Sequence, residues 1–265
     1  MVSSRKRITL KLNRAVQHLD ALREEIRQLV EGKDCRVIQD IDSDLGHLVV
    51  KARMLRAPSP LCSIYIGEAL YQFRSALDHL ICCLTEENGE VVHNKREFPI
   101  FDNRDKFRDP VSGDLMPGIK LRIDGLKTKH RALVEGEQPF QRKYGTAHDD
   151  PLWLLYCLSN YDRHQSLHLV GETVISGRET FIPASASSRF RRISSSYGPF
   201  EGETEVARFE IIPPTDSCPE LDVQVYSNVR FSVAFDQKGP GAGRPALRTL
   251  NEIEERASSL IKNFL

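Results

Sequence analysis

One long helical pattern, from Pro60 to Glu87, constrains the fold more than any other part of the sequence. Ser59 before Pro60 is typical of an N-cap followed by proline at the first helical position, and Asn88-Gly89 is typical of a helix end. At about 100° per residue, the apolar residues fall within one arc of the helix. They are Ile66, Ala69, Leu70, Phe73, Leu77, Leu80, Ile81 and Leu84. The pattern predicts one helix with a single face toward the main core.

Other segments carry helical signals of their own. The spacing of apolar residues predicts a helix over residues 8–30, with Gly32 as its C-cap. Asp150-Pro151 again places an N-cap before proline, at the start of the helical segment PLWLLYCLSNYDRH. Apolar residues on one face predict a last helix over residues 246–264.

Extended patterns predict the rest of the fold. The segments CRVIQDID and HLVVKARML indicate a β-hairpin, Cys35–Asp42 with His47–Leu55. Residues 166–235 alternate in the manner of strands, with turns that include Ser176-Gly177 and Pro213-Pro214. Helices, then strands, then one helix favour the α+β class. We expect a single domain over 1–265, with a mainly helical part 56–165 and a mainly β part 166–236 closed by helix 246–264.

Composition limits the classes of partner. Lys+Arg and Asp+Glu both number 37, so no net charge draws the chain toward nucleic acid or an anionic membrane. No apolar run reaches the roughly 18 residues of a membrane span, and the charged N-terminus is unlike a signal peptide. The six cysteines form no C-x-x-C pair. These features predict a reduced, cytoplasmic protein without a membrane partner.

The helix over residues 60–87 also carries a polar stripe away from its apolar face. Within the segment FRSALDHL, Arg74 and Asp78 are four residues apart and can pair, as can Ser75 and His79. A solvated helix face is the simplest interpretation of such a stripe. This stripe, however, contains no lysine and mixes aromatic and small residues with charges. That composition favours a face covered by another element, with a polar network between them.

The end of the helix after Pro151 is the candidate covering element. Its segment SNYDRHQSLH presents Asn160 and His164 near one side, and Asp162 falls toward the apolar side. A carboxylate there requires a hydrogen-bonded or cationic partner. We therefore expect the two helices to bring together Arg74, Ser75, Asp78, His79, Asn160, Asp162 and His164, in a site where a histidine pKa can be tuned.

Five short motifs lie within and after the long helical pattern. They are Ile66-Gly67-Glu68-Ala69-Leu70, FRSALDHL, Phe98-Pro99-Ile100, Gln138-Pro139-Phe140 and Ser159-Asn160-Tyr161-Asp162-Arg163-His164. Together they resemble a family of uncharacterised bacterial proteins that is common in actinobacteria. Its pattern is a Gly-Asp/Glu-Ala-Leu helix start, an LRSALDHL helix, an FPI segment, a QP-Phe/Tyr turn and an N-x-x-D-K-H-R-type helix end. The likeness extends from the hairpin to the last strands and implies no activity.

Residues Arg74 to His79 also form an R-x4-H motif, which is similar to the signature of HEPN domains, helical ribonucleases of toxin and defence systems. This resemblance covers only about residues 60 to 165. It implies a HEPN-like helical core, an RNA partner, no metal or other cofactor, and a site completed by a homodimer. Arg74 would stabilise the phosphate and His79 would act as general acid or base. Ser75, Asp78, Asn160, Asp162 and His164 would support this catalytic pair.

The sequence offers weaker alternatives. His164 and His168 have metal-ligand spacing, although a strand start near His168 would break that geometry. The segment GPGAGRP lacks the Lys-Ser/Thr of a phosphate-binding loop, so a plain connection is favoured. A Cys-His pair of Cys82 or Cys83 with His79 lacks a feature that lowers the thiol pKa. The basic segment RFRRIS, over residues 189–194, is a candidate phosphate contact but favours a solvated strand face.

Two functions therefore remain open from the sequence. The first is a HEPN-like, nucleic-acid-acting or defence-associated protein, with ribonuclease activity centred on Arg74 and His79. The second is a non-enzymatic binding or interaction protein, in which the Arg/Asp/His cluster is only a structural network. Accessibility discriminates between them, because an RNA substrate must reach both Arg74 and His79.

Overall fold

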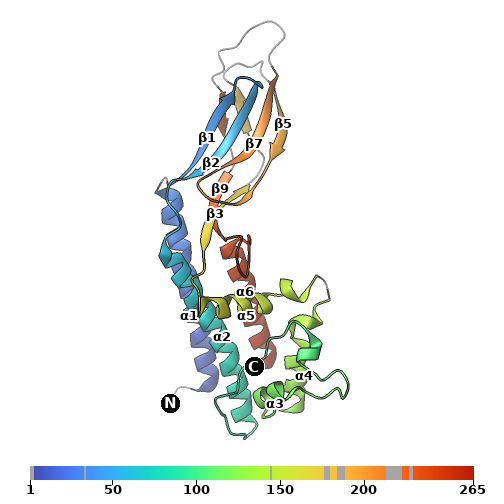
Figure 1. Ribbon diagram of the computed structural model, residues 1–265. Helices are drawn as coiled ribbons and strands as arrows, with labels where there is room; N and C mark the ends of the chain where they lie inside the picture. Colours follow the sequence, from blue (N-terminus) through green and yellow to red (C-terminus); the bar gives the residue numbers. More distant parts are fainter. Residues whose placement is uncertain are drawn as a thin grey trace.

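A computed structural model describes residues 3–32, 34–143, 145–175, 180–183, 189–212, 223–226 and 229–265. The molecule has a helical end and a β end (Figure 1). The predicted turns at Ser176-Gly177 and Pro213-Pro214 lie outside the described residues. The described helices are α1 (Ser4–Glu31), α2 (Pro60–Glu87), α3 (Pro117–Ile123), α4 (Thr128–Gly136), α5 (Pro151–Asp162) and α6 (Ala246–Phe264), with short 3-10 helices η1 (Arg104–Lys106), η2 (Pro139–Gln141) and η3 (Ala147–Asp149).

Helices α1 and α2 pack side by side and antiparallel, and a β-hairpin joins them at the β end of the molecule (Figure 1). Both predicted N-caps of the proline-started helices are confirmed. The Ser59 hydroxyl accepts a hydrogen bond from the Leu61 amide at 3.2 Å, and the Asp150 carboxylate accepts one from the Leu152 amide at 2.9 Å. Helix α1 starts earlier than its apolar pattern because Ser3 caps it through the Lys6 amide.

The described strands are β1 (Cys35–Asp42), β2 (His47–Met54), β3 (Leu169–Ile175), β4 (Thr180–Pro183), β5 (Arg189–Ser195), β6 (Gly198–Phe200), β7 (Glu203–Ile212), β8 (Val223–Tyr226) and β9 (Val229–Phe235). They form antiparallel sheets in the orders β1-β2-β7-β5, β6-β3-β9 and β4-β8. Strand β2 pairs directly with β7. The N-terminal hairpin thus completes a sheet whose other strands come from the second half of the chain.

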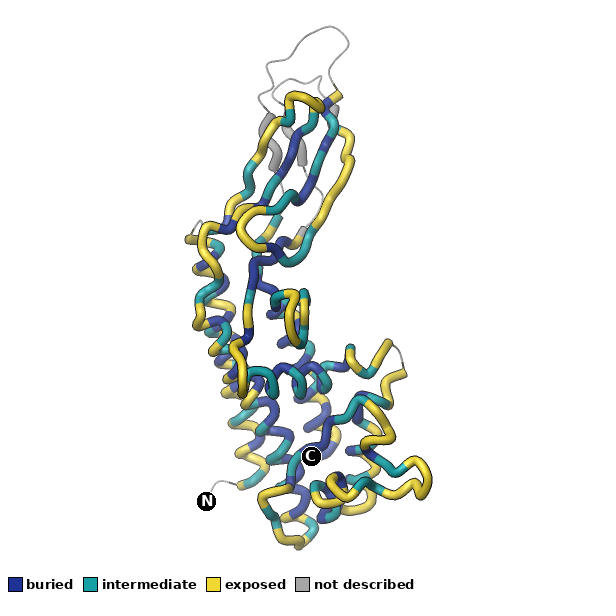
Figure 2. The backbone as a smooth tube through the Cα atoms, in the orientation of Figure 1, coloured by how far each residue is buried: buried dark blue, intermediate teal, exposed yellow. Residues whose placement is uncertain are grey.

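Helix α5 lies against the N-terminal half of α2, where Asp162 reaches Gly67, and α6 runs along the helical end beside α5, α2 and α1 (Figure 1). Helix α6 also contacts β9, so it links the helical end to the strands. Buried residues follow the facing sides of these helices and continue into the strands (Figure 2). One apolar cluster includes Leu80 of α2, Leu155 of α5, Leu260 of α6 and Val206 of β7.

These elements confirm the predicted α+β class, while a HEPN-like core stays a prediction. The described residues contain no helix long and apolar enough to cross a membrane. Helix α3 was not expected from the sequence, because it is short and begins at Pro117 without a side-chain cap. The hairpin after α1 has the predicted ends, except that β2 stops at Met54 rather than Leu55.

Candidate functional site

The polar residues of α2 do not form one shared site, because three different surroundings divide them. Arg74 and Asp78 face the segment that follows α2, His79 faces α1, and Gly67 faces the end of α5. In each of these surroundings α2 faces a different segment of the chain, so the three groups of polar residues have different neighbours and different chemical properties.

The first surrounding is a cluster that we call the Arg74 clasp, made of Arg74, Asp78, Glu97 and the Phe98 amide. Arg74 is only 8 % exposed. Its Nε lies 3.7 Å from the nearer Asp78 oxygen, and its Nη2 lies 3.8 Å from Glu97. The Phe98 amide donates a hydrogen bond of 2.9 Å to Asp78. The predicted pairing of Arg74 with Asp78 is thus present, and together they hold the FPI segment against α2.

Within the clasp, burial and the neighbouring groups have opposite effects on the Asp78 carboxyl. Burial raises the pKa of the Asp78 carboxyl, although Arg74 and the Phe98 amide both act to lower it. The Nη1 group of Arg74 is buried and has no hydrogen-bond partner among the described residues. Arg74 therefore lies beneath the surface with two carboxylates beside it, which leaves little of its positive field for a phosphate from outside.

His79 has a separate environment. It lies five positions after Arg74, which turns the two side chains about 140° apart around the helix axis. Burial lowers the pKa of His79, and Lys11 and Arg7 of α1 lower it further. No hydrogen bond or ion pair joins His79 to Arg74 within the described part of the chain. The two residues predicted to be catalytic therefore do not form a paired site within one chain.

The third surrounding is the contact of α5 with Gly67. Asp162 is the last residue of α5, and its carboxylate lies directly on the α2 backbone at Gly67. A methyl group added at Gly67 would lie 2.7 Å from the Asp162 carboxyl carbon, so any side chain at position 67 would require the Asp162 carboxylate to move. Burial raises the pKa of this carboxyl. No hydrogen bond or ion pair connects Asp162 to another described residue.

Two adjoining hollows, of about 530 Å³ and 280 Å³, open on either side of Asp162 and Ile64. We call them together the α5 groove. Its lining combines α1, α2 and the end of α5: Arg14, His18, Ser63, Ile64, Gly67, Glu68, Tyr71, Gln72, Asp162, His164, Gln165 and Ser166. His18 Nδ1 lies 2.8 Å from Glu68, and Tyr71 is 59 % exposed at the rim.

The α5 groove contains part of the predicted set. Asp162 and His164 lie in it, whereas Ser75 and Asn160 are half-buried outside its lining. Sequence reasoning missed His18 and Arg14, which α1 contributes, and Glu97 of the clasp. In the sequence, the one indication of Arg14 and His18 was that they are four residues apart and therefore lie on a single face of α1.

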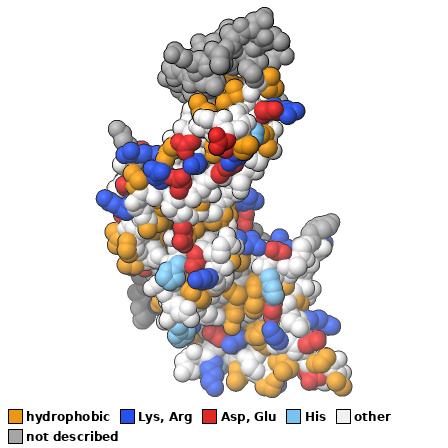
Figure 3. Space-filling model, turned by 45° about the horizontal axis from the view of Figure 1, so that its top comes forward, with side chains coloured by type: hydrophobic (Ala, Val, Ile, Leu, Met, Phe, Trp, Pro, Cys, Tyr) orange, Lys and Arg blue, Asp and Glu red, His pale blue; other side chains and the backbone are white. Residues whose placement is uncertain are grey.

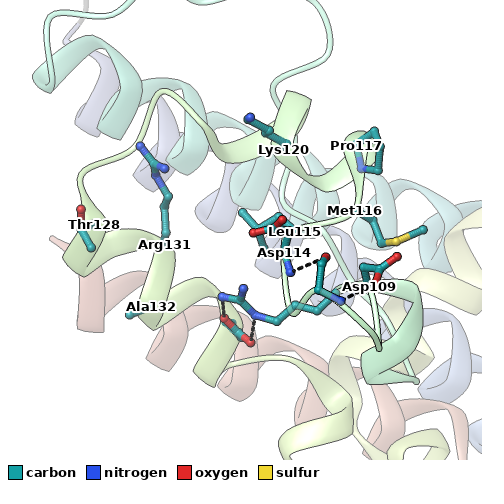
Figure 4. Close-up of a pocket in the computed structure, with 12 residues that line it drawn as sticks. Asp109, Asp114, Leu115, Met116, Pro117, Lys120, Thr128, Arg131 and Ala132 are labelled. Atoms are coloured by element: carbon teal, nitrogen blue, oxygen red, sulfur yellow. Dashed lines mark hydrogen bonds and ion pairs between the residues drawn. The ribbon is translucent and has the colours of Figure 1, made fainter.

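A larger hollow of about 900 Å³ lies between the loop over residues 108–117, α3 and α4 (Figure 4). Its main charges already serve the fold. Arg108 makes a two-pronged ion pair with Glu135, with both hydrogen bonds at 2.6 Å. Arg131 donates to the backbone carbonyls of Leu126 and Asp124 at 2.8 Å. We therefore consider the charged side chains that line this hollow to be structural, because they hold the loop in place.

The remaining chemical alternatives find little support. Helix α5 ends at Asp162, so His164 and His168 do not share a helix, and the described residues hold no group of three or more metal-ligating side chains. Burial raises the pKa of the Cys82 thiol, and it raises that of Cys83 to about 11, which keeps both protonated at neutral pH.

Acidic and basic side chains are intermixed on the face of the molecule that Figure 3 shows.

Comparison of the chain with known protein families, with curated proteins and with solved structures finds no match.

Proposed function

We propose that this protein is a non-enzymatic binding protein whose recognition site is the α5 groove. The observation that carries the proposal is the Asp162 carboxylate, which is half-buried against Gly67 and has no described protein partner. A groove of several hundred cubic ångströms with a few placed polar groups is typical of small-ligand sites. In this view the Arg74 clasp is structural.

A second candidate is a HEPN-like, nucleic-acid-acting protein with ribonuclease activity. It is favoured by His79, which lies close to Arg7 and Lys11 of α1, while Lys11 Nζ sits 5.6 Å from the exposed Tyr71 ring. Cations beside an aromatic ring suit single-stranded RNA. In this candidate the arginine opposite His79 would come from a second copy of the chain, because Arg74 of the same chain faces the clasp.

Incubation with a mixed single-stranded RNA in the presence of a chelator tests the two candidates directly. We expect no cleavage by the wild type, and we expect His79→Ala to keep the wild-type melting temperature, because His79 makes no described hydrogen bond or ion pair. Asp44→Asn, in the exposed turn between β1 and β2, serves as the control and should behave as the wild type does. Cleavage that is present in the wild type and lost in His79→Ala would replace the binding proposal with the ribonuclease.

A further inference from the structure

Asp162 stands at a place where three physical effects oppose a negative charge. It ends α5, where unpaired backbone carbonyls already give the helix a negative partial charge. Its contact with Gly67 removes water from the carboxylate, and that burial raises its pKa. No described residue donates a hydrogen bond or a positive charge to it. A carboxylate at a helix C-terminus, partly buried and without a described partner, is unfavourable for stability. Such an uncompensated residue indicates a functional position.

The cationic residues around the groove are engaged elsewhere. His18 pairs with Glu68 at 2.8 Å, and burial lowers the pKa of its imidazole, which favours the neutral form. Arg14 Nη1 donates a hydrogen bond of 3.1 Å to Gln17 on its own helix. The charge of Arg163, the next residue after Asp162, acts on Asp78 in the clasp. None of these three residues makes an ion pair with Asp162, whose carboxylate lines both hollows of the α5 groove.

We infer that the α5 groove binds a small organic cation, whose ammonium or guanidinium group lies against Asp162. This inference rests on the proposed binding function and names its ligand class. Glu68, which pairs with His18, adds a second carboxylate on the same wall, and the exposed side chains of Ile64 and Tyr71 supply apolar surface for the hydrocarbon chain of the ligand. A carboxylate and a guanidinium form charge-assisted, two-pronged hydrogen bonds.

A metal ion fits this groove less well than an organic cation. Calcium requires six or more oxygen ligands, and zinc commonly requires four ligands close together. Among the described residues, no three His, Cys, Asp or Glu side chains come together as a group that could hold a metal ion, so Asp162 and Glu68 lack the further ligands that such an ion requires. The glycine itself fits the inference, because any side chain at position 67 would displace the carboxylate from its place between the two hollows.

Calorimetric titration of the full chain at neutral pH tests the ligand class. The probes are arginine and spermidine as cations, citrulline as the neutral analogue of arginine, and glutamate as an anion. We expect arginine or spermidine to bind. Citrulline and glutamate should bind at least about tenfold more weakly, because they cannot form the charge pair with Asp162 and a tenfold change in affinity corresponds to about 1.4 kcal/mol. Asp162→Asn keeps the side-chain shape and should weaken cation binding by about the same factor.

Two further variants make the outcome decisive. Gly67→Ala should also abolish binding, by pushing Asp162 out of position, while the exposed hairpin-turn control Asp44→Asn should bind as the wild type does. Cation binding that is unchanged in Asp162→Asn overturns the inference. If citrulline or glutamate binds instead and Gly67→Ala abolishes it, the ligand class is wrong but the groove remains a binding site. If no probe binds at millimolar concentration, the proposed function falls as well.

Discussion

Glu172 is a buried carboxyl group whose protonation should control stability near neutral pH. It lies within β3 and is only 5 % exposed, and burial raises the pKa of its side chain to about 7. In the unfolded chain the same group titrates near its ordinary pKa of about 4.3. Between these values the folded state holds a proton that the unfolded state has released. Stability therefore falls as pH rises through this window and levels off above it.

Glu172→Gln replaces this carboxyl with a neutral group of the same shape. We expect the variant to lose the decline in unfolding free energy between about pH 4.5 and pH 7, and to exceed the wild type at pH 8 by on the order of 2 kcal/mol. Urea denaturation at closely spaced pH values measures this difference. Asp44→Asn, in the exposed hairpin turn, is the control and should leave the profile unchanged. Parallel profiles for Glu172→Gln and the wild type would contradict the assignment.

Single-residue predictions from the sequence were accurate where their partners are local. Both N-caps and the pairing of Arg74 with Asp78 depend on residues within four positions, so the helix geometry fixes them. The residues that surround Asp162 and His79 come from α2 and α1, whose relative rotation depends on the whole core. The sequence therefore located these polar residues without showing that they belong to separate surroundings.

At the level of elements, the Arg74 clasp fixes the segment around Phe98 to α2. Arg74→Met keeps the length and apolar packing of the side chain, but it leaves Asp78 half-buried without its cation. We expect a loss of about 2 kcal/mol in unfolding free energy, less than for a fully buried pair because Asp78 and Glu97 keep 30 % and 38 % side-chain exposure. The Phe98 amide should exchange its hydrogen faster, because its acceptor is no longer held.

Arg122→Met is the matched control for Arg74→Met. Arg122 pairs with the same Glu97 at 2.6 Å, but its side chain is 31 % exposed, so we expect a loss of at most about 1 kcal/mol. Urea denaturation and amide hydrogen exchange compare the two variants. Equal stability of Arg74→Met and the wild type, with unchanged protection at Phe98, would show that the clasp does not hold this segment.

Sequence periodicity predicted most elements because their patterns are long or their ends are marked. Helix α2 has both an N-cap with proline and a terminal Asn-Gly, and its ends match the prediction. Helix α3 escaped detection because seven residues give too few turns for a periodic signal, and no side chain caps it. The placement of α5 at Gly67 could not be derived from the sequence. A glycine permits another segment to approach the helix closely, but it does not indicate which segment does so.

At the level of the whole molecule, segments far apart in the sequence share one sheet and one core. Strands β1 and β2 come from the first quarter of the chain, and β2 pairs with β7. Helix α6 packs beside α5, α2 and α1 and also contacts β9. One continuous apolar cluster joins the two ends. We therefore expect the described helices and strands to unfold in a single cooperative transition.

Leu260→Ala tests this cooperativity from the far end of the chain. Leu260 of α6 is fully buried, so the substitution should lower the unfolding free energy by about 2–5 kcal/mol through lost apolar contact and a residual cavity. Fluorescence of Trp153, the one tryptophan of the sequence, reports on α5, and amide exchange in β7 reports on the strands. Because the core is continuous, both signals should shift to the same lower urea midpoint. Arg248→Ala, with a side chain 78 % exposed on the same helix, should change the midpoint little. A Trp153 transition that moves while β7 keeps its wild-type midpoint would show two independent units, with α6 belonging to the helical one.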